Sequence, residues 1–177
     1  MRSKRKFVFK PYKSMEDKYA SYRRKSLGWQ YDPSVKVHPR IIFGPGFRLT
    51  KEYAKTYNIT HVINCADETS SPAWFKLMHP KKYACLHAED SPSANILNWY
   101  SQFETIMQSF LKAPDANVIF VHCQAGVNRS GFLTLAFLCL HFGYDYEITV
   151  KSILKQRPCA LLNPAYQIQV EKRCAKE

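Results

Sequence analysis

Residues 118–131 read V-I-F-V-H-C-Q-A-G-V-N-R-S-G, an apolar run that ends at a cysteine and is followed six positions later by an arginine. The unbroken apolar run predicts a strand over 118–122 that is buried on both faces. A glycine-bearing loop comes next, and residues 131–142 have the composition of a helix. The stretch therefore predicts a strand, a tight loop and a helix, with Cys123 where the strand ends.

Segments on either side of this unit alternate between strand and helix patterns. Strands are predicted over 41–43, 60–65 and 83–87, and helices over 49–57, 96–111, 146–156 and 164–173. Such alternation is typical of an α/β domain with a mostly parallel central sheet flanked by helices. A chain of 177 residues has room for one such domain.

The loop after the central strand has the chemistry of an anion site. Backbone N–H groups in a loop between a buried strand and a helix N-terminus can bind a tetrahedral oxyanion, and Arg129 can donate to two of its oxygens. We expect the same positive field to favour the thiolate of Cys123, a nucleophile, while the Ser130 hydroxyl donates to the sulfur when it must leave. The expected phosphate-binding loop comprises Gln124, Ala125, Gly126, Val127, Asn128 and Arg129.

The motif His122-Cys123-x5-Arg129-Ser130 resembles the signature of cysteine-dependent protein phosphatases. The stretches THVINCADE at 60–68, AEDSP at 88–92 and QRPCALLNPAY at 156–166 resemble the small dual-specificity members, including poxvirus-type enzymes. The resemblance covers residues 41 to about 174. It implies a protein tyrosine phosphatase-like fold and hydrolysis through a phosphocysteine intermediate, with no metal or cofactor.

The departing oxygen of a phosphoester needs a proton, so the mechanism requires a general acid. Asp90 follows the predicted strand 83–87 and matches the acid-bearing loop of the resembled family. We expect strands 83–87 and 118–122 to be neighbours whose carboxyl ends meet. Glu89 and Asp67 are the competing acids, and helix capping is the alternative role for Asp90.

Three further residues are candidates for supporting roles. We expect His122 to hold the loop by hydrogen bonding rather than to act as an acid or base. The resemblance implies that Asn163 braces the loop, although a helix N-cap before Pro164 is an alternative. It also implies that Cys65, at the end of the strand 60–65, captures an oxidised Cys123; the alternative is a small buried residue.

The six cysteines form no C-x-x-C pair, so we expect reduced thiols. Cys85 and His87, two positions apart, are expected to be strand residues on one face rather than ligands of a structural metal. No apolar stretch is long enough to span a bilayer, and no secretory signal is expected, which favours a cytoplasmic or nuclear protein that is not secreted.

The resemblance implies phosphoprotein substrates carrying phosphotyrosine, phosphoserine or phosphothreonine in a shallow, open pocket. The loop interior contains no lysine, which disfavours inositol phospholipids. An RNA 5′-triphosphatase of the same superfamily is the alternative enzyme, because GVNRSG resembles that group. A phosphate-binding pseudophosphatase is the non-enzymatic alternative.

The positive charge is concentrated in residues 1–40, which hold 12 lysines and arginines against three acids, whereas the rest holds 14 against 11. We expect a basic N-terminal extension over 1–40 and a catalytic domain over 41–177. The extension should contain a helix over about 15–26, with Tyr19 and Tyr22 on one face, and a linker over 29–39. The helix suggests docking on its own domain or homodimerisation, and the charge suggests nucleic acid or another acidic partner.

Overall fold

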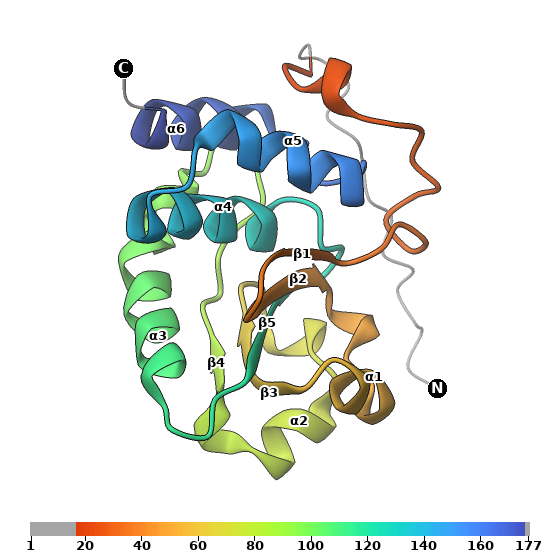
Figure 1. The fold of residues 1–177 in the computed structure, drawn as a ribbon, viewed down its shortest axis with the longest axis vertical. Helices are drawn as coiled ribbons and strands as arrows, with labels where there is room; N and C mark the ends of the chain where they lie inside the picture. Colours follow the sequence, from red (N-terminus) through yellow and green to blue (C-terminus); the bar gives the residue numbers. More distant parts are fainter. Residues whose placement is uncertain (1–16, 176–177) are drawn as a thin grey trace.

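Five strands form one sheet whose order is β1-β2-β5-β3-β4 (Figure 1). The computed structural model describes residues 17–175. Its strands are β1 (Val35–His38), β2 (Ile41–Pro45), β3 (Ile59–Asn64), β4 (Tyr83–Cys85) and β5 (Val118–Cys123). All neighbours run parallel except the β1–β2 pair. The central strand is β5, as its apolar sequence predicts.

Helices cover both faces of the sheet, so side chains alternate along β5 between two cores. Ile119 and Val121 face the larger core, and Val118 and Phe120 face the smaller one. The larger core lies under α3 (Tyr100–Lys112), α4 (Arg129–Phe142), α5 (Tyr146–Gln156) and α6 (Pro164–Cys174), and the smaller one under α1 (Lys51–Thr56) and α2 (Ala73–Met78) (Figure 1). This double burial confirms the predicted α/β class.

Most predicted elements are present, with shifted ends. The helix predicted over 49–57 is shorter, since Thr50 caps α1 by accepting from the Tyr53 amide. The segment 96–111 begins with a 3₁₀ turn, Ile96–Trp99, before α3. The sequence patterns missed two elements: α2, and the edge strand β1, which lies within the segment predicted to be a linker.

The predicted helix over 15–26 is wrong for the described residues, where only Ala20–Tyr22 forms a 3₁₀ turn; Met15 and Glu16 lie outside them. Tertiary contacts hold the chain in an extended path instead. Tyr19 is buried with its hydroxyl against that of Tyr146, and the Tyr22 hydroxyl donates to Glu147. The two tyrosines therefore dock on α5 of their own domain, the first of the two docking sites considered for this segment.

Part of the basic charge of the extension is also used within the domain. Arg23 pairs with Asp17 at 2.6 Å and donates to the carbonyls of Pro158, Ala160 and Leu161. Lys18 pairs with Glu171. Lys18 and Arg23 therefore tie residues 17–23 to the C-terminal part of the chain.

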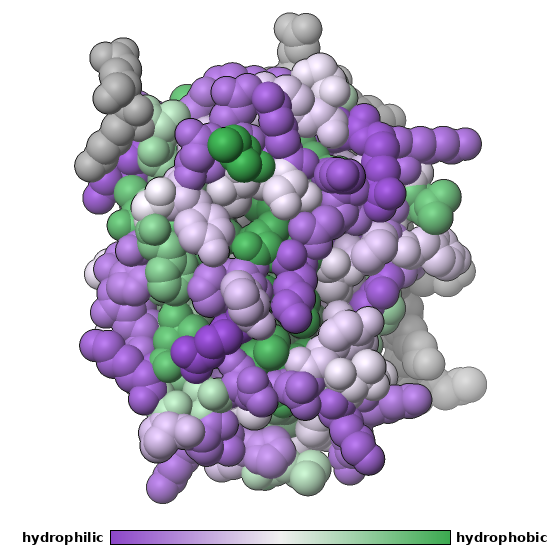
Figure 2. All heavy atoms as spheres, in the orientation of Figure 1, coloured by the Kyte–Doolittle hydropathy of each residue, from purple (hydrophilic) through white to green (hydrophobic). Residues whose placement is uncertain are grey.

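Polar side chains cover most of the face drawn in Figure 2, and apolar ones are visible mainly between them. Within residues 17–175, no helix is both long enough and apolar enough to cross a bilayer.

Candidate active site

The register of the sheet brings Cys123 to its carboxyl edge between two flanking strands. Cys123 is paired with Pro45 of β2, and the Cys65 amide donates to the carbonyl of His122 at 2.7 Å. The chain then turns through residues 124–128 and enters α4 at Arg129. Strand, loop and helix therefore follow one another as the sequence predicts, with the thiol at the base of the loop.

The carbonyl groups of the loop point outward and are held there. The carbonyls of Ala125 and Gly126 accept from the guanidinium of Arg157 at 2.8 and 2.7 Å, and that of Val127 accepts from the Leu161 amide at 2.7 Å. Because the N–H and C=O of a peptide point in opposite directions, this leaves the amide hydrogens facing inward, toward Cys123. The loop has the polarity of an anion site.

Gly126 is required by the fold of this loop. Its φ of +63° lies in the left-handed region, and a Cβ there would come within 2.3 Å of the Pro45 nitrogen and 2.4 Å of the Gly44 carbonyl carbon. Both contacts are with backbone, which cannot move aside easily. Any larger residue would push the loop away from the end of β2.

Two residues of the first turn of α4 are directed at the reacting region. The Ser130 hydroxyl lies 3.2 Å from the Cys123 sulfur, and both groups are buried. Arg129 donates through Nη1 to the Ala88 carbonyl at 3.1 Å. Its buried Nε has no hydrogen-bond partner among residues 17–175, so a donor remains for a bound oxyanion.

Asp90 is brought to the loop by two asparagines. Its carboxylate accepts from Asn128 Nδ2 at 3.1 and 3.3 Å and from Asn163 Nδ2 at 3.2 Å. Asn128 Oδ1 also accepts from the amides of Leu162 and Asn163. Asn128 therefore links the loop after β5 to the Asp90 carboxylate and to the segment before α6, a role that the sequence patterns did not assign to it.

The route by which Asp90 arrives differs from the predicted one. Strand β4 is not a neighbour of β5, because β3 lies between them. Asp90 instead lies in the segment after β4, where the amide of Ala88 donates to the Cys65 carbonyl. The Tyr166 hydroxyl also holds this segment through the carbonyl of Glu89.

Asp67, a competing acid, is engaged as a helix cap. Its carboxylate accepts from the Thr69 hydroxyl and from the amide and hydroxyl of Ser70. These hydrogen bonds, that of Thr69 most of all, lower the pKa of Asp67. Asp67 is therefore engaged in capping Glu68–Ser70, whereas Asp90 contacts Asn128 of the loop.

Asn163 is the N-cap of α6, and its side chain contacts the segment that carries Asp90. Its Oδ1 accepts from the amides of Ala165 and Tyr166 as the N-cap of α6, while its Nδ2 donates to Asp90 and to the Ser91 carbonyl. His122 is buried, and its ring nitrogens lie 3.0 Å from the Ser71 hydroxyl and 3.2 Å from the Cys123 carbonyl. Burial lowers the pKa of His122 to about 4, so the ring is neutral at physiological pH.

Arg157 is a residue whose role sequence reasoning missed, although it lies within the quoted stretch QRPCALLNPAY. It is fully buried and donates to five carbonyls. Two belong to the phosphate loop, and three belong to the N-terminal segment, at Trp29, Asp32 and Pro33. Arg157 therefore ties the described part of the basic extension to the loop that surrounds Cys123.

An open depression of about 370 Å³ adjoins the loop at Gln124. It is lined by Trp29, Phe47 and the segment 69–72, and the two aromatic rings meet edge to face at 5.9 Å. A larger hollow of about 560 Å³ lies between η1 (Ala20–Tyr22), α5 and α6 and contains no part of the loop.

Comparisons with known proteins agree with this geometry. The family model described as dual specificity phosphatase, catalytic domain, matches residues 41–173. The chain is 31% identical over 123 residues to dual specificity protein phosphatase 22-B of Danio rerio, covering 69% of this chain and 63% of that protein. It is 27% identical to the MAP kinase phosphatase with leucine-rich repeats protein 2 of Dictyostelium discoideum, covering 70% of this chain and 17% of that one.

The chain thus spans less than two thirds of the length of these relatives. Among solved structures, it resembles human DUSP28 with a TM-score of 0.67 and 21% identity, over 81% of this chain and 93% of that one. The human tyrosine phosphatase-like serine/threonine/tyrosine-interacting protein is as similar, with a TM-score of 0.67 and 21% identity over 80% and 95% of the two chains. With the family model matched over most of its length, the chain belongs to the family of dual specificity phosphatase catalytic domains.

Proposed function

We propose that this protein hydrolyses phosphomonoesters on protein side chains, phosphotyrosine as well as phosphoserine and phosphothreonine, through a phosphocysteine intermediate. One observation carries the proposal: the Cys123 thiol lies at the base of a loop with outward-held carbonyls, while Asn128 of that loop holds the Asp90 carboxylate. Nucleophile, anion site and acid are therefore fixed to one another through a single loop.

In the first step, the Cys123 thiolate attacks phosphorus and the bond from phosphorus to the ester oxygen breaks. The departing oxygen takes the proton of Asp90, so an alcohol or phenol leaves and Asp90 becomes a carboxylate. Arg129 and the loop amides stabilise the equatorial oxygens, on which negative charge is concentrated.

In the second step, water attacks the phosphocysteine and gives a proton to the Asp90 carboxylate. The phosphorus–sulfur bond breaks, inorganic phosphate is released and the electron pair returns to sulfur. The Ser130 hydroxyl, 3.2 Å from that sulfur, donates to the emerging thiolate. Asp90 is protonated again at the end of the cycle, so proton and phosphoryl transfers balance.

The surroundings of the loop favour a side chain on a protein surface as the substrate. The depression beside Gln124 is open and has an aromatic edge at Trp29 and Phe47, which suits a polypeptide lying across the site. The loop interior lacks the lysines that a more highly charged phosphate would call for.

Initial rates on four substrates test the proposal: phosphotyrosyl, phosphoseryl and phosphothreonyl peptides and a 5′-triphosphate RNA. The Cys123→Ser protein is the blank, and Cys139→Ser, which changes a thiol near the C-terminal end of α4, is the matched control. We expect phosphate release from the peptides by the wild type and the control only. Release of the RNA γ-phosphate alone would contradict the proposal and indicate an RNA triphosphatase. Phosphopeptide binding without turnover would contradict it and indicate a pseudophosphatase.

We also propose that the basic residues of 1–13, which lie outside the described residues, bind an acidic partner, with nucleic acid as the first ligand to test. A cytoplasmic or nuclear location is part of this proposal. Binding of a labelled oligonucleotide should weaken steeply with salt and should be lost when these lysines and arginines become glutamine. Unchanged binding in that variant would contradict it.

A further inference from the structure

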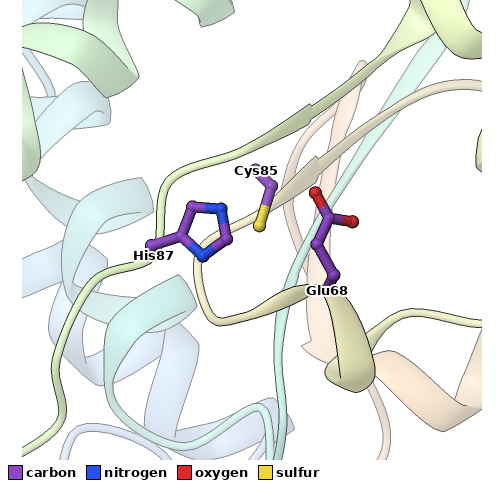
Figure 3. A group of neighbouring side chains, drawn as sticks. All are labelled: Glu68, Cys85 and His87. Atoms are coloured by element: carbon purple, nitrogen blue, oxygen red, sulfur yellow. The ribbon is translucent and has the colours of Figure 1, made fainter.

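Three side chains with metal-binding atoms converge next to the acid-bearing segment but outside the proposed catalytic machinery. Glu68 begins the 3₁₀ turn η3 (Glu68–Ser70), Cys85 ends β4, and His87 follows two residues later. Their ligand atoms all lie within 4.8 Å of one another. Figure 3 shows the Cys85 sulfur between the His87 ring and the Glu68 carboxylate. We propose that these three side chains bind a Zn²⁺ ion and leave its fourth position open to water.

The backbone holds the three residues together without a metal. Strand β3 pairs with β4 so that Asn64 lies opposite Cys85, which brings the chain after β3 alongside the end of β4. The carbonyl of Ala66, two residues before Glu68, accepts from the Cys85 thiol at 3.1 Å and from the His87 amide at 3.0 Å. His87 has a φ of +55°, so the chain turns sharply there. The ligands are therefore fixed at their backbones before any ion binds.

The ligand set selects the metal. A thiolate, an imidazole and a carboxylate together suit Zn²⁺, whereas Mg²⁺ and Ca²⁺ take oxygen ligands. Bond lengths of about 2.0–2.3 Å imply ligand atoms roughly 3.3–3.8 Å apart around tetrahedral zinc. The three atoms must therefore close in by up to about 1.5 Å. Glu68 and His87 are exposed and can do so by rotating their side chains.

The present partners of these groups are weak competitors. The Glu68 carboxylate pairs with Lys76 at 3.1 Å and accepts from the Tyr83 hydroxyl at 2.8 Å. The ion pair is largely exposed, and such pairs contribute little. The Cys85 thiol gives its proton to solvent when the zinc–sulfur bond forms. Zinc thus competes with one exposed ion pair, one hydrogen bond from the Tyr83 hydroxyl and one thiol hydrogen bond.

Three protein ligands and an open position differ from the closed, four-ligand structural sites. The ion would be exchangeable and exposed. It would also lie at the start of the segment that carries Asp90, since His87 precedes Ala88, whose carbonyl accepts from Arg129. The expectation that Cys85 and His87 simply share one strand face therefore needs revision, because the strand ends at Cys85.

Cobalt titration of the full chain tests the site, because tetrahedral Co²⁺ has intense visible bands and Co²⁺ bound to a thiolate has a near-ultraviolet charge-transfer band. The Cys123→Ser background removes the catalytic thiol as a competing ligand, so the readout is independent of phosphatase activity. We expect one Co²⁺ per chain with both kinds of band, displaced by Zn²⁺. In this background, Cys85→Ser should abolish the thiolate band, and His87→Ala and Glu68→Gln should each weaken binding by about tenfold or more.

Cys139→Ser and His79→Ala are the matched controls, and neither should change the spectrum or the affinity. The two exposed ligands, Glu68 and His87, can be replaced without disturbing the core, so their variants remain informative if Cys85→Ser folds poorly. The proposal is overturned if no thiolate–cobalt band appears or if the band survives Cys85→Ser. Loss of the band in Cys139→Ser, or unchanged affinity in both His87→Ala and Glu68→Gln, would also overturn it.

Discussion

The buried guanidinium of Arg157 donates through Nε to the carbonyl of Gly126 at 2.7 Å, and so supports the phosphate loop from behind. Burial lowers the pKa of Arg157, but the side chain remains charged at any pH at which the protein is folded. The same guanidinium reaches the carbonyls of Trp29 and Asp32. The shape of the anion site therefore depends on contacts with the N-terminal segment that lie outside the family match.

Replacing Arg157 should lower both the stability of the protein and its turnover. Arg157→Met leaves five buried carbonyls without their donor, and we expect a loss of at least about 3 kcal/mol in the free energy of unfolding. Arg157→Lys keeps the charge but loses the planar fork, so it should restore only part of the loss. Urea unfolding measures the stability, and kcat for an aryl phosphate at permissive temperature reports on the loop.

Arg24→Met is the matched control, because Arg24 is exposed and makes one long contact, 3.3 Å, to the Gln156 carbonyl. We expect its stability within about 0.5 kcal/mol of the wild type. Equal effects of the two methionine substitutions would contradict the role assigned to Arg157.

Asp90→Asn should slow the release of poor leaving groups much more than that of good ones. A general acid raises the rate of the chemical step by about 10²–10⁴-fold, and this factor applies only where the departing oxygen needs its proton. Wild-type kcat/KM should rise and then fall with pH, because attack needs ionised Cys123 and protonated Asp90. The falling limb should disappear in Asp90→Asn.

Glu89→Gln serves as the control for the neighbouring carboxyl. It should keep both the rate and the pH profile, since the contact holding Glu89 is made through its backbone carbonyl. A profile that changes in Glu89→Gln and not in Asp90→Asn would move the acid to Glu89.

His122 should make the protein less stable as the solution is acidified. The folded pKa, about 4, is below the value of 6.5 for a free imidazole, so between these pH values the unfolded chain binds more protons. The contribution of neutral His122 to the free energy of unfolding is therefore fully present above pH 6.5. It falls toward pH 4, and the loss is about 2 kcal/mol at about pH 5. Urea unfolding of wild type and His122→Asn at several pH values measures the difference.

The comparison isolates His122, because His38 and His61, whose pKa values burial also lowers, are present in both proteins. The pH dependence should be shallower in His122→Asn. Parallel curves for the two proteins would show that His122 is not held neutral by the fold.

Mild peroxide should inactivate the enzyme reversibly through a bond between Cys65 and Cys123. Peroxide converts the Cys123 thiolate to a sulfenic acid, and the Cys65 thiol attacks that sulfur, releasing water and forming a disulfide. Cys65 is fully buried, and burial together with the nearby charge of Cys123 raises its pKa well above the usual range. Its thiolate is therefore scarce, and we expect the disulfide to form slowly. Peptide mass mapping should find the 65–123 disulfide. Equal yields of sulfinic acid at Cys123 in wild type and Cys65→Ser would exclude Cys65 as the resolving thiol.

The sequence predicts the strand, loop and helix around Cys123 well because the three are contiguous. Cys123, Gly126 and Arg129 lie within seven residues, so their spacing alone defines the loop. The bonds from Asn128 to Asp90 and from Arg157 to Trp29 join residues 38 and 128 positions apart. No local pattern encodes such pairings.

The N-terminal segment shows the opposite case, in which a clear local pattern gave the wrong element. The spacing of Met15, Tyr19 and Tyr22 favours a helix, but contacts of Tyr19 with Tyr146 and of Arg23 with three carbonyls hold the chain extended. Weak helix propensity is overridden by these contacts. Strand β1 has only four residues, too few for its alternation to stand out.

Detection of the covalent intermediate tests the central claim most directly. The Asp90→Asn protein is mixed with an aryl phosphate whose leaving group departs without protonation, so that the first step does not depend on Asp90. The mixture is quenched rapidly and digested, and the peptide containing Cys123 is weighed. Because the second step also needs Asp90 as a base, the intermediate should accumulate, and we expect that peptide to carry the mass of one phosphoryl group on sulfur. The phosphorylated form of this peptide should be absent when Cys123→Ser is added to the Asp90→Asn protein. Phosphate release that persists in Cys123→Ser, or a phosphoryl group on another residue, would contradict the mechanism.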